Sequence, residues 1–458
     1  MALAPRDDDE QVSFSPLPPG RHGLDRRAVG EHQRERIVQA MTQMVLEDGF
    51  QGLTIARLCK RARVTERAFY RQFASLEWCF LAAYESIVES YLASILEAYD
   101  ATTAWDEALE RALRAVLETA AEQPRQARLL LVEAPTAGQR GVERARGLTD
   151  TLQAQVARHA QRAPGAARVP ELIVRGIVGG IRDVIGNRLA TNSASELPQL
   201  VEPLLAWILS YVSDSPLELG RAPAPRRRRA AALAPQNGPP PLAGHGHPRE
   251  FVRENQRQRL MDATAAVSRE RGYAGLTVSA IARRARVSHK TFYEHFTDRN
   301  DAFLSTYRYD RRAAFAIAER GYAGDSGDWP RELHRVLHAL LDWLAERPDH
   351  AHLGFVAFPA TGANAHFARR HSLQMFSRLL APGYGDVADV PAIAGEAIAG
   401  AVFEMVAEEI VRGRAERLPE LSPLVSYIVL APFVGAVEAA DVARERPGQP
   451  APAAGSGV

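Results

Sequence analysis

The 458-residue sequence is poor in cysteine and has no long apolar run. Its two cysteines, Cys59 and Cys79, are too few for a secreted disulfide scaffold or for a zinc site of their own. The longest apolar stretch, Ile428 to Val437, contains Pro432 and is shorter than the roughly 18 residues that a membrane span needs. An apolar signal segment is also lacking at the start. These absences predict a soluble cytoplasmic protein with no membrane association.

The formal net charge is only +1, but the basic residues are unevenly placed. Residues 31–73 carry 8 basic and 5 acidic side chains, and residues 254–296 carry 8 and 4. Residues 216–248 carry five Arg and one Glu. Positive charge gathered at defined places indicates contact with a polyanion, here nucleic acid.

The sequence contains one long internal repeat. Residues 34–84 align without a gap to residues 257–307, with 18 identities in 51 positions. The similarity continues at nearby offsets, since Trp105, Pro124 and Pro135 correspond to Trp329, Pro348 and Pro359, and Gly179 corresponds to Gly400. This pattern predicts a tandem duplication of a whole domain.

Each copy has the sequence pattern of a helical protein. Residues 31–48 place apolar side chains on one helical face, and Gly49 follows where a helix C-terminal glycine belongs. Thr54 then offers an N-cap hydroxyl to a short helix over 55–61, and Thr65 caps another that ends near Phe73. Amphipathic segments at 76–98, 105–122 and 300–320 follow, and strand patterns are absent. The sequence therefore predicts an all-α fold with a helix-turn-helix at the start of each copy.

Motifs around these helices resemble the DNA-binding domain of the tetracycline-repressor (TetR) family. The motifs are Gly52-Leu-Thr54, Ile55-Ala56, Ala62-Arg-Val64 and Phe69-Tyr70-Arg-Gln-Phe73 in the first copy, and Gly275-Leu-Thr277, Ile281-Ala282, Ala285-Arg-Val287-Ser288 and Thr291-Phe-Tyr293-Glu-His-Phe296 in the second. The resemblance implies two TetR-like units. Each unit would have a three-helix DNA-binding head and a helical body for ligand binding and dimerisation. The family's usual mechanism is repression relieved by a small-molecule ligand.

Carried over residue by residue, the resemblance assigns DNA contacts to both heads. In the first copy they are Thr54, Thr65, Glu66, Arg67, Ala68, Tyr70, Arg71 and Gln72; in the second they are Thr277, Ser288, His289, Lys290, Thr291, Tyr293, His295 and Arg299. Arg and Lys read guanine edges and hold phosphates, whereas a carboxylate such as Glu66 reads cytosine but also repels phosphate, so its role stays open. Four aromatic residues that alternate with these should pack inward: Phe69, Phe73, Phe292 and Phe296.

Two departures from the family pattern stand out. The turn usually carries Gly where this chain has Arg63 and Arg286, although Arg tolerates a positive φ poorly. The first copy has Leu76 where the second has Arg299, so we expect one phosphate contact fewer and weaker DNA binding in the first head.

The sequence divides into seven segments on these grounds. They are a disordered tail (1–29), a first DNA-binding domain (30–75), a first regulatory domain (76–215), a flexible Pro/Arg-rich linker (216–248), a second DNA-binding domain (249–298), a second regulatory domain (299–445) and a disordered tail (446–458). The linker run Arg226 to Arg229 is either solubilising or in contact with phosphate.

Ligand-binding and metal-binding signals are weaker. The candidate walls of a ligand pocket are Trp105, Trp329, Trp343, Phe355, Phe376 and Phe403, any of which is equally compatible with core packing. His334 and His338 have a spacing that can hold a metal, but no third ligand is evident, so no metal is predicted. No phosphate loop or nucleophile elbow occurs, which argues against an enzyme and predicts no cofactor.

The two reading helices differ almost everywhere except at the Phe-Tyr pair. This difference predicts an intramolecular pseudo-dimer that reads an asymmetric double-stranded operator in the nucleoid. The predicted role is that of a ligand-responsive repressor, and activation is the alternative. Pairing between chains as a homodimer is the alternative assembly. The alternative function is a helical small-molecule- or partner-binding protein in which one or both heads no longer bind DNA.

Overall fold

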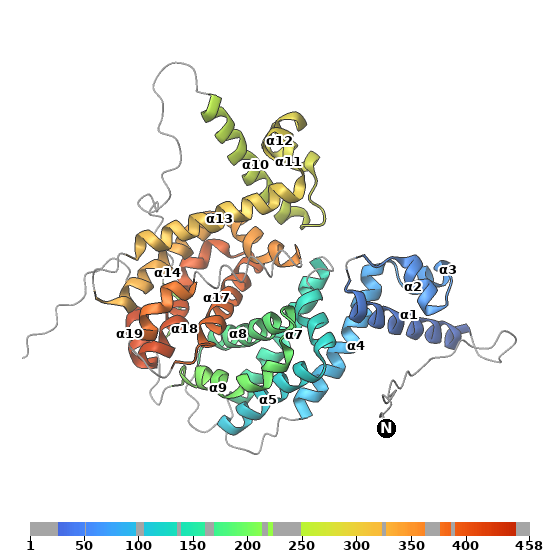
Figure 1. The fold of residues 1–458 in the computed structure, drawn as a ribbon, viewed down its shortest axis with the longest axis horizontal. Helices are drawn as coiled ribbons and strands as arrows, with labels where there is room; N and C mark the ends of the chain where they lie inside the picture. Colours follow the sequence, from blue (N-terminus) through green and yellow to red (C-terminus); the bar gives the residue numbers. More distant parts are fainter. Residues whose placement is uncertain are drawn as a thin grey trace, which may run out of the picture. The chain divides into compact units, whose positions relative to one another are not determined.

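The computed structural model describes residues 26–50, 52–97, 105–134, 139–160, 169–212, 219–222, 249–322, 327–361, 376–385 and 390–445 (Figure 1). The chain divides into two compact units, Met1–Val88 and Glu89–Val458, and each is described by itself. The described residues are helical and contain no strand, which confirms the predicted all-α class. No helix among them is both long and apolar enough to cross a membrane.

The first unit contains a three-helix head. Its helices are α1 (Arg26–Asp48), α2 (Ile55–Ala62) and α3 (Glu66–Gln72), and α4 (Leu76–Glu97) follows. The side chains of Ile37, Met41, Leu58 and Phe69 are almost completely buried, and they form the core where the three helices meet. The predicted helix bounds are confirmed to within a residue or two, except that α1 begins inside the predicted disordered tail.

The second unit contains the second head, built from the same elements in the same order. Its helices are α10 (Arg249–Arg271), α11 (Val278–Ala285) and α12 (His289–His295), followed by α13 (Arg299–Gly321). The core of this head includes Leu353, Ala357 and Phe358, which come from the body that follows it. The second head and its body therefore share one core.

Both bodies belong to the second unit, and several of their elements recur in the same order. The first has α5 (Trp105–Glu122), α6 (Pro124–Arg128), the π-helix η1 (Leu129–Glu133), α7 (Gln139–Ala160), α8 (Glu171–Ala190), η3 (Ala194–Leu200) and α9 (Val201–Leu209). The second has α14 (Trp329–Ala345), α15 (Pro348–His352), the π-helix η4 (Leu353–Ala357), η5 (Phe358–Thr361), α17 (Ala394–Val411), η6 (Ala415–Leu421), α18 (Ser422–Val434) and α19 (Ala436–Arg444). The short helix and the π-turn after it recur at the same positions of the repeat, so the duplication extends to local backbone irregularities.

The two bodies pack against each other mainly through α8 and α17. A Cβ on Gly179 of α8 would lie 2.4 Å from the Cβ of Glu404, and a Cβ on Gly400 of α17 would lie 2.6 Å from that of Asp183. Gly179 and Gly400 correspond in the repeat, as do Asp183 and Glu404. The contact is therefore reciprocal, as at the two-fold axis of a symmetric dimer.

Part of the predicted flexible linker has a defined place. Arg221 forms a two-pronged ion pair with Glu409, with N–O distances of 2.6 and 3.0 Å, and the amide of Ala222 donates to the carbonyl of Glu420. The linker prediction is therefore wrong for residues 219–222. The run Arg226 to Arg229 and the predicted tail 446–458 lie outside the described residues.

Candidate nucleic-acid interface

The two short helices of each head begin at hydrogen-bonded caps. The Thr54 hydroxyl accepts from the amide of Arg57 at 3.3 Å, and the Thr277 hydroxyl accepts from that of Ala280 at 3.2 Å. Thr65 and Ser288 cap the second short helix in the same way, accepting at 3.2 and 3.0 Å. All four caps are exposed, and they place the reading helices α3 and α12 at the surface of their heads.

The turn between the two short helices contains the strain that the sequence predicted. Arg63 has φ of 51° and Arg286 has φ of 55°, both in the left-handed region that favours glycine. Arg36 and Arg259, on the first helix of each head, donate to the carbonyls of these turns, at 2.9 and 3.1 Å for Arg63 and Arg286. These guanidinium groups hold each turn in a conformation that its own residue disfavours.

Most predicted reading residues lie at the surface. Tyr70 and Tyr293 are 57% and 59% exposed and stand edge-on to the buried rings of Phe69 and Phe292. The other exposed positions are Glu66, Arg67 and Arg71 on α3 and His289 and Lys290 on α12, while Thr291 is half-buried. Phe69, Phe73, Phe292 and Phe296 are buried, which confirms the prediction that they pack inward.

Three predicted reading residues are placed differently. Ala68 is buried at 8% exposure, so the assignment of a DNA contact to its side chain is corrected. Gln72 and His295 are half-buried at the ends of their helices. Burial lowers the pKa of His295, and the charges of Arg253 and Arg257 add to that lowering.

Arg299 forms hydrogen bonds with the loop before α11. Its Nη1 donates to the carbonyls of Ala274 and Leu276 at 3.1 and 2.6 Å, so this guanidinium fastens the loop as well as facing solvent. The first head has no such bond, because Leu76 occupies the position. The sequence comparison found the difference between the heads but missed the loop contact.

Several basic residues of the heads form ion pairs or ring contacts within their own head. Arg61 pairs with Glu47 and Arg284 pairs with Glu270, each at 2.6 Å. Arg34 and Arg257 lie over the rings of Phe73 and Phe296. The positive charge available to DNA is therefore concentrated on fewer residues than the simple count of basic side chains suggests.

The family described as bacterial regulatory proteins of the tetR family matches residues 37–83 and 260–305. The chain carries the TetR-family domain twice. These two TetR domains coincide with the two heads, and they support a DNA-binding transcriptional regulator.

Several solved structures are similar to parts of the chain. A TetR-like transcriptional regulator from Rhodococcus sp. RHA1 is 21% identical, with a TM-score of 0.33 over 41% of this chain and 98% of that one. The fatty acid degradation regulator FadR from Bacillus halodurans is 18% identical, with a TM-score of 0.34 over 39% and 94%. A putative tetR family regulator from Shewanella sp. PV-4 is 17% identical, with a TM-score of 0.32 over 38% and 94%. No curated protein matches.

A buried histidine joins the second TetR domain to its body. The Nδ1 of His350, on α15, lies 2.9 Å from both carboxylate oxygens of Asp310 on α13, and its Nε2 lies 3.1 Å from Asp262 on α10. Burial alone would lower the pKa of His350, but the hydrogen bonds and charges of the two carboxylates outweigh it and raise the pKa to about 9. The imidazolium therefore clamps three helices together at neutral pH. We call this set the His350 clamp.

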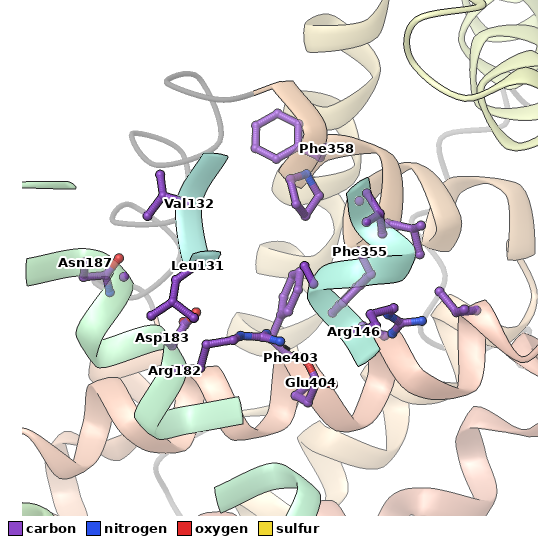
Figure 2. Close-up of a pocket in the computed structure, with 18 of the residues that line it drawn as sticks. Leu131, Val132, Arg146, Arg182, Asp183, Asn187, Phe355, Phe358, Phe403 and Glu404 are labelled. Carbon is purple, nitrogen blue, oxygen red and sulfur yellow. Dashed lines mark hydrogen bonds and ion pairs between the residues drawn. The ribbon is translucent and has the colours of Figure 1, made fainter. Parts of the chain in front are cut away.

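A cavity of about 190 Å³ lies between the two bodies (Figure 2). The first body contributes η1, α7 and α8 to its wall, and the second contributes Tyr307 on α13, η4, η5 and α17. Two predicted ligand residues meet here, since the rings of Phe355 and Phe403 stack with centroids 4.8 Å apart. A second cavity of about 140 Å³, lined mainly by apolar side chains, lies within the first body.

Three other predicted ligand residues, Trp329, Trp343 and Phe376, do not line these two cavities. Trp329 is buried, donates from Nε1 to the carbonyl of Leu379 and packs edge-on against Phe433. Trp343 is buried in a cluster with Ala313 and Ile317. These two tryptophans are core residues, so their assignment to a pocket is corrected. Phe376 is half-buried, and Trp105 begins α5 with a side chain outside the description.

The two histidines whose spacing could hold a metal, His334 and His338, contact other protein groups. His334 bonds to the Ser426 hydroxyl at 2.7 Å and to the carbonyl of Glu445 at 3.1 Å, and His338 lies 3.5 Å from Asp342. No cluster of three or more potential metal ligands occurs in the described part of the chain.

Proposed function

We propose that this chain is a ligand-responsive transcriptional repressor in which the two bodies pair within one chain and the two unlike heads read an asymmetric operator. The observation that carries the proposal is the interface between α8 and α17. A symmetric dimer uses the same surface patch of two identical subunits, whereas here the patch is formed by two helices of different sequence.

The ion pairs across this interface join basic residues of the first copy to acidic residues of the second. On α8, Arg175 pairs with Glu404 at 3.2 Å and with Glu408 at 2.8 Å, and Arg182 pairs with Glu404 at 2.8 Å. Farther along, Arg188 pairs with Glu396 at 3.2 Å. In each of these pairs the first copy supplies the cation and the second supplies the anion.

This division favours pairing of unlike copies. Glu404 is 2% exposed, so an α17–α17 pair between chains would bury two such carboxylates without the arginines that neutralise them. Breaking a buried pair typically costs about 3–5 kcal/mol, which is enough to decide between assemblies. The structure therefore supports the intramolecular pseudo-dimer over the homodimer.

The experiment is selection of bound sequences from a random double-stranded DNA pool by the full-length protein. We expect two unlike half-sites at a fixed spacing, and a monomeric mass in solution. A palindrome together with a dimeric mass would overturn the pseudo-dimer. No enrichment at any salt concentration would overturn the regulator and favour the ligand- or partner-binding alternative.

Variants on the reading helices sharpen the test. Arg67→Ala should weaken binding at one half-site only, and Lys290→Ala at the other, each by about tenfold if the side chain contacts a base edge. Arg158→Ala, an exposed arginine of α7, is the matched control. Equal loss at both half-sites from either variant would contradict separate reading by the two heads.

A further inference from the structure

We propose that the cavity between the two bodies binds one small aromatic carboxylic acid per chain. The binding of the acid is a property of the cavity itself. Its role as the effector rests on the function proposed above.

The cavity lies where the two copies face each other, but its two walls are chemically different. Positions that correspond in the repeat carry Arg182 on one side and Phe403 on the other, and likewise Leu131 and Phe355. In a symmetric dimer a site here would have two equal halves. In this chain the site is polarised, and a ligand with two unlike ends fits it in one orientation.

The wall from the second copy is aromatic. Phe355 and Phe403 stack on each other, and Phe358 stacks on Tyr307 with centroids 3.6 Å apart and planes inclined by 5°. Aromatic rings bind a flat apolar group through both area and ring geometry. This wall therefore accepts a ring.

The wall from the first copy presents a guanidinium with spare donors. The Arg146 side chain is 15% exposed, and its Nη2 lies 3.8 Å from Glu408, a carboxylate that Arg175 already approaches at 2.8 Å. No hydrogen bond from Arg146 occurs within the described residues. Burial lowers the pKa of Arg146, and the charges of Arg175 and Arg182 contribute. A buried guanidinium with unused donors favours an incoming carboxylate, which binds it through two hydrogen bonds.

The acidic side chains of the wall leave room for this anion. Glu404 is neutralised by Arg175 and Arg182, while Asp183 and Arg146 lie on opposite sides of the cavity in Figure 2. A carboxylate at the Arg146 end therefore avoids Asp183.

The size of the cavity limits the ligand to one ring. An apolar cavity of about 150 Å³ holds benzene, and the volume here is about 190 Å³. A benzoate-sized acid fits this space.

Binding here reaches the second head directly. Phe358 belongs both to the cavity wall and to the core shared by the second head and its body. Phe355 lies in the π-helix η4, which immediately follows α15, the short helix that carries His350. A ligand that shifts this π-helix acts on the His350 clamp, so the second head is the one that the acid regulates.

The test uses isothermal titration of the full-length chain with benzoate and with benzamide, its neutral isostere. We expect one benzoate per chain and at least tenfold weaker binding of benzamide. Equal affinities, two sites per chain or no benzoate binding would overturn the proposal. Equal affinity for hexanoate would overturn its aromatic part.

Variants locate the site. Arg146→Met should weaken benzoate at least tenfold and leave benzamide unchanged, and Phe355→Ala should weaken both. Arg158→Met, on the same helix, is the control. Unchanged benzoate affinity in both cavity variants would place the binding elsewhere and overturn the proposal. The benzoate–benzamide comparison needs no variant, so it stands even if a substitution prevents folding.

DNA selection separates the two proposals. If the chain does not bind benzoate but still enriches half-sites, the ligand proposal fails and the regulator proposal stands. If the chain binds benzoate but enriches no DNA sequence, the regulator proposal fails and the proposed binding site stands.

Discussion

The two heads share their internal contacts and differ in what surrounds them. Caps, turns, the Arg–Glu pairs and the arginine over the last phenylalanine recur in both. The His350 clamp does not recur, because the positions that correspond to Asp262, Asp310 and His350 carry Gln39, Ile87 and Gln126. Nor does the aromatic residue at position 358, which corresponds to Ala134.

This difference shows where duplicated domains are free to change. A head must fold, so its caps and turn contacts are retained in both copies. The contacts that join a head to its body set how that head responds, and here they have diverged. The sequences of the two helices α3 and α12 have diverged as well, so the copies differ both on these exposed helices and in the attachment of the head.

The largest expected effect comes from filling the contact between the copies. A Cβ on Gly180 would lie 2.4 Å from the carbonyl oxygen of Ala397, a backbone atom that cannot move aside cheaply. We expect Gly180→Leu to destabilise the paired bodies by about 3 kcal/mol or more, because overpacking forces backbone shifts. Thermal unfolding and limited proteolysis measure this. Gly186→Ala on the same helix meets nothing within 4 Å and should be neutral or slightly stabilising.

The next effect compares the two equivalent carboxylates of the interface. Glu404→Gln removes the buried charge that Arg175 and Arg182 both approach, and it should cost about 3 kcal/mol of unfolding free energy. Asp183→Asn, the same change at the corresponding position of α8, should cost clearly less, because Glu404 is approached by two arginines of the opposite copy within 3.2 Å and is more deeply buried, at 2% exposure against 8%. Chemical denaturation of both variants provides the comparison, and equal losses would contradict the division of charge between the copies.

The His350 clamp gives a prediction that depends on pH. The pKa of His350 is raised to about 9 in the folded protein, so its contribution is fully present below the unfolded value of 6.5 and is lost as the pH rises through 9. The total contribution is of the order of 3 kcal/mol. Hydrogen exchange of α10 should therefore accelerate between pH 7 and pH 10 beyond its intrinsic rise.

His350→Gln, which installs the residue of the first copy, provides the control. It should accelerate exchange of α10 at pH 7 and abolish the extra pH dependence. Exchange of α1 in the same sample serves as the reference. An unchanged pH dependence in this variant would show that another group is responsible.

The smallest effect concerns a feature that the heads share. Arg63→Gly and Arg286→Gly each relieve a left-handed residue but also loosen the unfolded chain, so stability should change by no more than about 1 kcal/mol. The two substitutions should act alike, because the turn is alike in both heads. Unequal changes, measured by denaturation of each variant, would indicate that one turn is held by its surroundings.

The local structure of the heads could be predicted from the sequence, whereas contacts between distant segments could not. Helix caps and the strained turns depend on residues a few positions apart, so Thr54 and Arg63 could be read from the pattern. The burial of Ala68 depends on how α3 docks on its neighbours, and the loop contact of Arg299 spans more than twenty residues. Asp262, Asp310 and His350 have no spacing that marks them as partners. The cavity likewise needs both copies in place before Phe355 and Phe403 meet.

Pairing of the bodies within one chain also changes how the protein responds to its own abundance. A regulator assembled from two separate chains loses its dimer on dilution, so the amount of DNA-binding species falls with the square of the chain concentration. Bodies joined through α8 and α17 of the same chain have no subunit dissociation constant, because their effective concentration is fixed by the tether. For the operator binding proposed above, occupancy would then fall only in proportion to the number of chains.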